Sequence, residues 1–343
     1  MGEVIVALGA RTALGHRAAT TACAALAGIA RIQAHPRARD KAGDPFLVAY
    51  DRSIPASTRL PRMAALAESA LREAMSNLPT QALTHLPIFL GLPEFGPFFA
   101  EHHASEICVR LSAALRGSCP LTILSVPQGD AAGVYALEHA IAGLRDQAFE
   151  LCLVGGVDSL VDALQLEALD ESRRVRSASN RWGFYPGEGA AVLALTTHSF
   201  AHRHRMPILA QVLATGSAIE ASSMHSRQVC VGEGLAGAMR TASHALSAVG
   251  RQYCDINGER YREHEYAYAI LRVPADTFVD SLDYEAPADR WGNPGAASAP
   301  LLALLPIVAH ARRPSLGGDP MIWCSSENGY RGAIVLRLEK CRQ

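Results

Sequence analysis

The 343-residue sequence has only two lysines, Lys41 and Lys340, and its other basic residues are arginines. A mechanism that needs a lysine in the middle of the chain is therefore excluded. The formal net charge is -1, and charged residues make up 19% of the chain. Because no overall field would attract nucleic acid or an anionic membrane, we expect no nucleic-acid partner.

Cysteine pairs and long hydrophobic runs are also missing. The eight cysteines are scattered with no CxxC pair, which favours a reducing, cytoplasmic compartment. The longest apolar run, residues 299–309, contains prolines and is too short to cross a bilayer. Because the N-terminus also lacks the charged start of a signal peptide, we expect no membrane span.

The sequence does contain a regular alternation of strand-like apolar runs and helical patterns, which is typical of βαβ units and a mainly parallel sheet. Residues 30–57, rich in proline, are expected to form a loop. We predict one compact unit of two similar halves, residues 1–200 and 206–343. The predicted strands are 3–8, 87–92, 121–125, 150–155, 188–196, 207–219, 253–257, 321–324 and 332–338. The predicted helices are 16–28, 61–78, 100–116, 130–144, 160–169, 234–250, 263–272 and 295–311.

Five segments, in the same order along the chain, resemble those of β-ketoacyl synthases, the condensing enzymes of the thiolase fold. They are ALGARTALG (7–15), VGGVDSLVD (154–162), GFYPGEGAAVLAL (183–195), GEGLAGAMRTASHAL (232–246) and WGNPGAASAPL (291–301). The resemblance implies an α/β, thiolase-like fold, with two pseudo-repeated βαβαβαββ halves in a five-layered αβαβα arrangement. It also implies a dimer formed through a strand of the first half.

The nucleophile motif of that family is Cys, two small residues and Gly, about two dozen residues before a double glycine. GDAAG (129–133) fits this frame and places Asp130 where the family has its cysteine. One family histidine aligns with Asn257 in DING. The second family histidine aligns with Asn293 or with Gly292, depending on where a one-residue gap is placed in the alignment.

The resemblance also implies which residues surround the nucleophile position. Gly129 precedes it, and the family's C-terminal glycine-rich loop is reduced to Gly329 and Tyr330. These three residues are therefore expected to line the pocket. The family lysine is missing, since only Arg290 lies near its position.

The expected place of Asp130 at a helix N-terminus affects its ionisation and its strength as a nucleophile. In condensing enzymes the helix N-terminus stabilises the cysteine thiolate. The same field holds an aspartate ionised by about 0.3 to 1 kcal/mol, which makes it a poor nucleophile, so we expect Asp130 to cap the helix. Asn257 and Asn293 cannot transfer protons near neutral pH, but their amides can donate hydrogen bonds to an acyl carbonyl.

Other motifs have simpler interpretations. GEGLAG (232–237) matches the dinucleotide pattern GxGxxG, but it follows a short strand and is interpreted as a helix entry. The histidine pairs 102–103 and 202/204 lack ligand-spaced partners, so no metal site is predicted. Residues 263–265 (Glu-His-Glu) are interpreted as a solvated helix face. The arginines within 171–181 could dock an acidic carrier protein or form an ordinary charged loop.

Retained glycine motifs with lost catalytic side chains predict a catalytically silent ketosynthase-like protein, comparable to a chain-length factor. Such a protein would pair with an active ketosynthase or with itself, and could contact acyl carrier protein, in fatty-acid, polyketide or aryl polyene biosynthesis. One alternative is an acyltransferase or thioesterase that uses Asp130, or a histidine such as His264, on acyl-CoA or acyl-carrier substrates. Another is a scaffold without an acyl ligand. No cofactor is predicted.

Overall fold

The computed structural model describes residues 2–56, 58–117, 119–244, 246, 248–312 and 318–339. Lys340 and Cys341 lie outside the described residues, as do positions 245 and 247 of the helix expected over 234–250. The main sheet has ten strands in the order β10-β9-β11-β12-β8-β1-β7-β6-β4-β5. Its two halves are joined where β1 pairs with β8 through Val4 and Ile5.

The two halves of the sheet have the same topology. Numbered along its own half, each has the strand order 3-2-4-5-1, and in each the fifth strand runs antiparallel to the first and fourth. The first half contains β1 (Glu3–Thr12), β4 (Leu86–Gly91), β5 (Leu121–Val126), β6 (Leu151–Ser159) and β7 (Glu188–Thr197). The second contains β8 (Ala210–Ile219), β9 (Gln252–Cys254), β10 (Tyr284–Glu285), β11 (Met321–Ser325) and β12 (Tyr330–Leu338).

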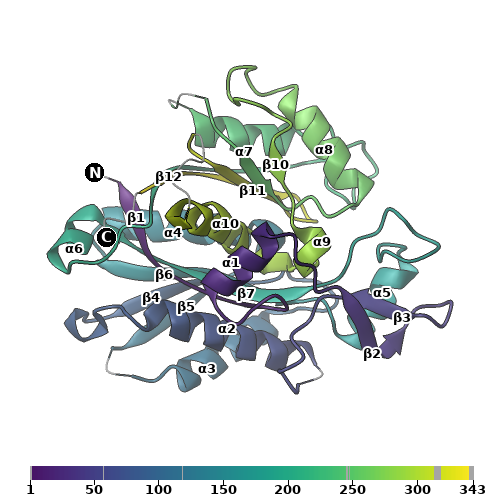
Figure 1. The fold of residues 1–343 in the computed structure, drawn as a ribbon, viewed down its shortest axis with the longest axis horizontal. Coiled ribbons are helices and arrows are strands. Elements are labelled where there is room, and N and C mark those ends of the chain that lie inside the picture. The colour runs from purple at the N-terminus through teal and green to yellow at the C-terminus, as the bar shows by residue number, and fades with distance from the viewer. Residues whose placement is uncertain are drawn as a thin grey trace.

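Helices cover both halves and fill the space between them, which confirms the expected five layers (Figure 1). The central helices, α4 (Ala132–Arg145) and α10 (Ser298–Arg312), contact strands of both halves. Helices α2 (Arg59–Met75) and α3 (Glu101–Ala114) cover the outer face of the first half. Helices α7 (Glu233–Ser243) and α8 (Arg260–Ile270) cover the outer face of the second.

Burial on both faces explains the apolar strands. Every residue of β4 and β6 is buried, as expected for parallel strands between two helical layers. The helical stretch Gly295–Arg312 is long and apolar enough to cross a membrane, but 83% of it is buried inside this protein. Its composition is therefore explained by its place between the two halves of the main sheet.

Residues 30–57 do not form only a loop, as the sequence suggested. They contain a hairpin of β2 (Gln33–Arg39) and β3 (Pro45–Val48) that turns through Gly43 at φ +88°. Phe46 and Val48 are buried in a small separate core with Val161, which stabilises strands too short and too rich in proline to be recognised. The remaining helices are α1 (Ala18–Leu26), α5 (Ala163–Glu171), α6 (His198–Arg203) and α9 (Ala288–Trp291).

Candidate functional site

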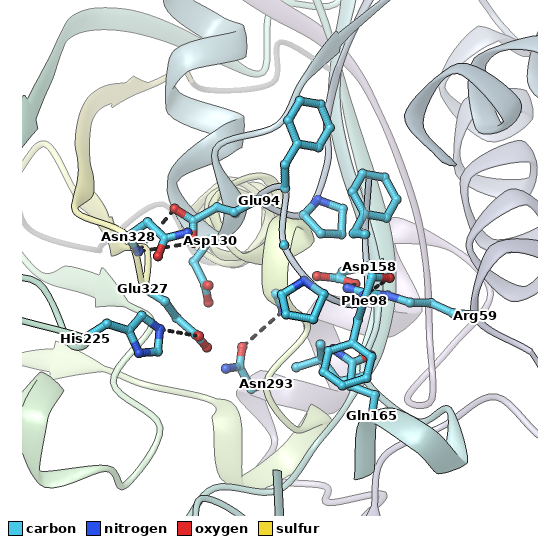
Figure 2. Close-up of a pocket in the computed structure, with 18 residues that line it drawn as sticks. Arg59, Glu94, Phe98, Asp130, Asp158, Gln165, His225, Asn293, Glu327 and Asn328 are labelled. Carbon is cyan, nitrogen blue, oxygen red and sulfur yellow. Dashed lines mark hydrogen bonds and ion pairs between the residues drawn. The ribbon is translucent and has the colours of Figure 1, made fainter. Parts of the chain in front are cut away.

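A cavity of about 370 Å³ opens at the N-terminal end of α4 (Figure 2). Segments from both halves line it, including the loop 93–99 after β4, the end of β6 and the loop 327–328 after β11. These segments follow the carboxyl ends of strands in parallel pairs, where α/β folds usually place their ligand sites.

Asp130 lies on this cavity but does not cap α4. It belongs to the turn Gly129–Ala131 directly before the helix, and among the described residues its side chain accepts a hydrogen bond from Arg262 rather than from a backbone N–H of the helix. The N–H of Ala131 donates instead to Ser326 Oγ at 2.8 Å. The expectation that Asp130 caps the helix is therefore wrong, because a serine from the second half already occupies that position.

The ionisation expected for Asp130 also needs correction. Burial raises the pKa of Asp130 to about 7, and the carboxyl groups of Asp255 and Glu327 act in the same direction. The guanidinium of Arg262 opposes this rise, but it does not outweigh the loss of water. Burial therefore favours the protonated form of Asp130 much more than in an aspartate that is exposed to water.

Arg262, on α8, connects Asp130 to the second half. Its Nη2 donates to Asp130 Oδ1 at 3.3 Å, and its Nη1 donates to Asp255 Oδ2 at 2.5 Å and to the carbonyl of Ser325 at 2.7 Å. Burial acts to lower the pKa of Arg262, but the charges of Asp255 and Asp130 outweigh it and raise that pKa. The nucleophile position is thus part of a buried ionic network.

The two asparagines lie in different places. Asn293 is 5% exposed and lines the cavity with Gly129 and Asp130, and its Oδ1 accepts a hydrogen bond from Gly295. Asn257 does not line this cavity, because its amide exchanges hydrogen bonds with Glu259 at the start of α8.

The glycine-rich loop is also displaced from the expected position. Gly329, with φ +110°, forms a turn, and Tyr330 packs edge-on against Tyr135. Neither residue lines the cavity, but their neighbours Glu327 and Asn328 do. Gly292, the alternative to Asn293, lies outside the lining as well.

Two glutamates of the cavity were not predicted. Burial raises the pKa of Glu94 to about 7, although its carboxylate accepts a hydrogen bond from the backbone N–H of Asn328 at 3.2 Å. Burial also acts on Glu327, but Arg174 outweighs it and lowers the pKa of that group. Both glutamates come two or three residues after a buried strand, which was the only available signal in the sequence.

The rest of the lining combines ion pairs with aromatic rings. Arg59 Nη2 lies 2.7 Å from Asp158 Oδ1. Phe95 and Phe98 are 46% and 41% exposed on the loop after β4. The cavity therefore has a charged floor and an apolar wall.

No cysteine described by the structure lines the cavity, and the only histidine in its described lining is His225. The His225 side chain is 59% exposed and lies 3.4 Å from Glu327. Burial raises the pKa of six cysteine thiols, so none of these six is activated as a thiolate. They are Cys108, Cys119, Cys152, Cys230, Cys254 and Cys324.

One cluster in the second half has side chains that can bind metals. Glu220, Cys230 and Glu265 are buried with ligand atoms within 4.8 Å of one another. Glu265 already pairs with Arg331 at 2.6 Å, and burial raises the pKa of Cys230 to about 11. These contacts fit a hydrogen-bonded core better than a metal site. The interpretation of residues 263–265 as a solvated face holds for Glu263 and His264, which are exposed, but is wrong for Glu265, which is only 1% exposed.

The remaining motifs have structural roles. Gly232, with φ +69°, lies where a Cβ would be 2.5 Å from the carbonyl oxygen of Glu265, so GEGLAG brings α7 and α8 into close contact. Within residues 171–181, Arg174 is largely buried against Glu259 and Glu327 and is not free to meet a carrier protein.

Comparisons with known proteins agree with this architecture. Residues 110–201 match the family model described as beta-ketoacyl synthase, N-terminal domain. No curated protein matches the chain in sequence.

Solved structures match over nearly the whole chain. AntDE:AntF, a type II PKS acyl-carrier protein in complex with its ketosynthase, matches with TM-score 0.79 and 15% identity, over 98% of this chain and 99% of the other. The ketosynthase from module 6 of the bacillaene synthase of Bacillus subtilis 168 matches with TM-score 0.79 and 12% identity, over 99% and 72%. The ishigamide ketosynthase/chain length factor matches with TM-score 0.67 and 19% identity, over 98% and 99%.

At these identities the structural matches establish the fold, and the family model adds sequence similarity around Asp130. The chain therefore has the thiolase-like fold of ketosynthases, which confirms the resemblance to β-ketoacyl synthases that its motifs indicated.

Proposed function

We propose that this chain is a catalytically silent ketosynthase-like protein that pairs with an active ketosynthase, as a chain-length factor does, in polyketide, fatty-acid or aryl polyene biosynthesis. The observation that carries the proposal is the carboxyl group of Asp130 at the start of α4, hydrogen-bonded to buried Arg262. A carboxylate in such a pair is a weak nucleophile. Its acyl product would be an anhydride that water hydrolyses.

Proton transfer by histidine, as in the family, is also poorly supported in the cavity. Asn293 contributes an amide, which does not titrate near neutral pH. His225 is mostly exposed and pairs with Glu327. The described lining of the cavity thus contains no thiol, and its single imidazole, that of His225, lies beside Glu327 rather than beside Asp130.

The edge of the sheet at β5 is the surface we propose for a partner. Within the described residues, β5 pairs with β4 on one side only. Leu124 on this strand is 43% exposed. An edge strand offers unpaired backbone groups to another strand, so we propose that the ketosynthase partner, or a second copy of this chain, adds its strand there.

Co-expression tests this proposal. The chain is produced together with a candidate ketosynthase and carrier protein from the same source, and any complex is isolated through a tag on the chain. We expect the ketosynthase to co-purify, and omission of the chain to change the length or yield of the product. A chain that purifies alone and changes no product would contradict the proposal.

A specific observation favours a second candidate, an acyltransferase or thioesterase. Asp130 and Glu94 both have pKa values raised to about 7, which suits a general acid or base. Incubation with acyl-CoA and acyl-carrier thioesters separates the candidates. Thioester cleavage that is lost in Asp130→Ala and kept in the exposed-site control Asp289→Ala would support the hydrolase and overturn the silent function.

A further inference from the structure

Carboxyl groups outnumber cations around the cavity. Each of the three guanidinium groups near the cavity is neutralised by one carboxylate. The pairs are Arg59 with Asp158 at 2.7 Å, Arg174 with Glu259 at 2.8 Å and Arg262 with Asp255 at 2.5 Å. Glu327 shares Arg174, and Asp130 shares Arg262 at the longer distance of 3.3 Å. Glu94 has no ion pair with any described residue. The cavity is therefore net negative.

Two buried side chains leave one polar atom each without a partner. Asp130 is 7% exposed and Asn293 is 5% exposed. No described residue donates a hydrogen bond to Asp130 Oδ2 or accepts one from Asn293 Nδ2. Both side chains line the same cavity, and Figure 2 shows the carboxyl group of Asp130 pointing towards the amide of Asn293. A ligand that pairs with both atoms must therefore offer a hydrogen-bond donor to Asp130 Oδ2 and an acceptor to Asn293 Nδ2.

The wall beside these atoms is aromatic. Phe95, Phe98 and Phe99 line the cavity from one loop, and the ring of Phe99 also lies 5.6 Å from the Arg59 guanidinium carbon. Aromatic faces accept both apolar groups and organic cations. The occupant should thus have an apolar body in addition to its polar groups.

We propose that the cavity binds an aminoacyl group, which is a carbonyl with an α-ammonium, carrying an apolar or aromatic side chain. The ammonium would donate to Asp130 Oδ2 and face Glu94. The carbonyl would accept from Asn293 Nδ2, and the side chain would pack against Phe95 and Phe98. A free amino acid fits less well, because its carboxylate would add negative charge to a negative site.

This inference goes beyond the silent-partner function and does not require a ketosynthase. Binding is measured on the chain alone by calorimetry with phenylalaninamide as the probe. Two matched compounds remove one group each: 3-phenylpropionamide lacks the ammonium, and phenethylamine lacks the carbonyl. We expect phenylalaninamide to bind about tenfold or more tightly than either compound, since each loses a hydrogen bond to a buried group.

Variants test the residues that make the contacts. Glu94→Gln and Asp130→Asn should each weaken phenylalaninamide about tenfold, and should affect 3-phenylpropionamide little. Glu68→Gln, at an exposed ion pair on α2, should leave both affinities unchanged. If Asp130→Asn does not fold, the affinity of Glu94→Gln for phenylalaninamide tests the inference alone.

Proton release provides an independent measurement. Binding of the cation near neutral pH should release protons from Asp130 and Glu94, seen as a dependence of the binding heat on the buffer. Equal affinity for the three compounds, no binding of phenylalaninamide, or variants with unchanged affinity would each overturn the inference. Failure to co-purify with a ketosynthase would contradict only the partner function.

Discussion

Arg262 is one of the side chains that connect the first and second halves at the nucleophile position. It hydrogen-bonds Asp130 and Asp255 and also the carbonyl of Ser325. Buried ion pairs of this kind contribute little net stability, but removal of one partner is costly because a charge is left uncompensated. The network therefore makes the residues around Asp130 interdependent.

We predict that Arg262→Met lowers the free energy of unfolding by about 3 to 5 kcal/mol. The reason is that Asp130 and Asp255 would remain buried without a cation. Urea unfolding followed by circular dichroism measures the effect. Arg72→Met, which removes a half-exposed partner of Glu68, is the control and should cost about 0 to 1 kcal/mol.

A second prediction concerns pH. Burial raises the pKa of Asp130 to about 7 from an ordinary value of 3.8, so the native state binds more protons than the unfolded state between these values. The contribution of Asp130 to stability is then greatest below about pH 4 and falls as the pH rises to about 7.

The Asp130→Asn variant isolates this effect because it lacks the titration. In urea unfolding, its stability relative to the natural protein should increase from about pH 5 to about pH 7 and then level off. A difference that does not change with pH would show that Asp130 is ionised throughout.

For single residues, the sequence predicted that Asp130 precedes a helix, because GDAAG and the double glycine lie close together along the chain. It did not predict Arg262, which lies 132 residues away. Nor did it predict that Ser326 would accept the N–H of Ala131, since that contact spans 195 residues. Contacts between distant segments leave no periodicity in the sequence.

Whole elements were easier to predict than contacts. The long strands and helices follow clear apolar patterns, and most of them lie within a few residues of their expected ranges. The exception is α7, which was expected to continue to residue 250 and ends at Ser243. The hairpin β2–β3 was missed because its exposed residues alternate with only a few buried ones. Elements that depend on a small local core are therefore recognisable only from the structure.

The double glycine of β6 has a packing role that can be tested. A Cβ at Gly156 would lie 2.1 Å from the carbonyl oxygen of Ala296, just before α10. We predict that Gly156→Ala destabilises the protein by at least about 1 to 3 kcal/mol. The added methyl group would overlap the backbone at Ala296, which cannot move aside as a flexible side chain could. Thermal unfolding measures the loss.

Gly237→Ala on α7 is the matched substitution. A Cβ at Gly237 meets only Ala218 Cβ at an ordinary 3.5 Å. Because alanine favours a helix by about 0.5 to 1 kcal/mol over glycine, this variant should be neutral or more stable. Equal losses at the two positions would contradict the packing argument.

For the whole molecule, the repeated strand order supports two halves of related architecture, and we propose the boundaries 1–200 and 206–343 for them. The halves meet through β1 and β8, the central helices and the cavity residues. Neither half would therefore contain a complete site by itself.

Assembly can be tested at the β5 edge. Leu124→Arg places a charge on the proposed interface, and we predict that it abolishes co-purification with a ketosynthase or shifts a homodimer to monomer. Light scattering after size-exclusion chromatography measures the mass. Leu271→Arg, at a 78% exposed leucine beyond α8, should leave assembly unchanged, and loss of assembly in both variants would argue against a specific edge.

The hydroxyl of Ser326 accepts the N–H of Ala131 and donates to the carbonyl of Gln128. During translation, the first half emerges from the ribosome long before this serine is made. The first turn of the nascent α4 must therefore remain hydrated until the ribosome has synthesised the next 195 residues, up to Ser326. The cavity can therefore be completed only after the second half has been synthesised through Asn328, and a chain that ends shortly before Ser326 would lack this contact.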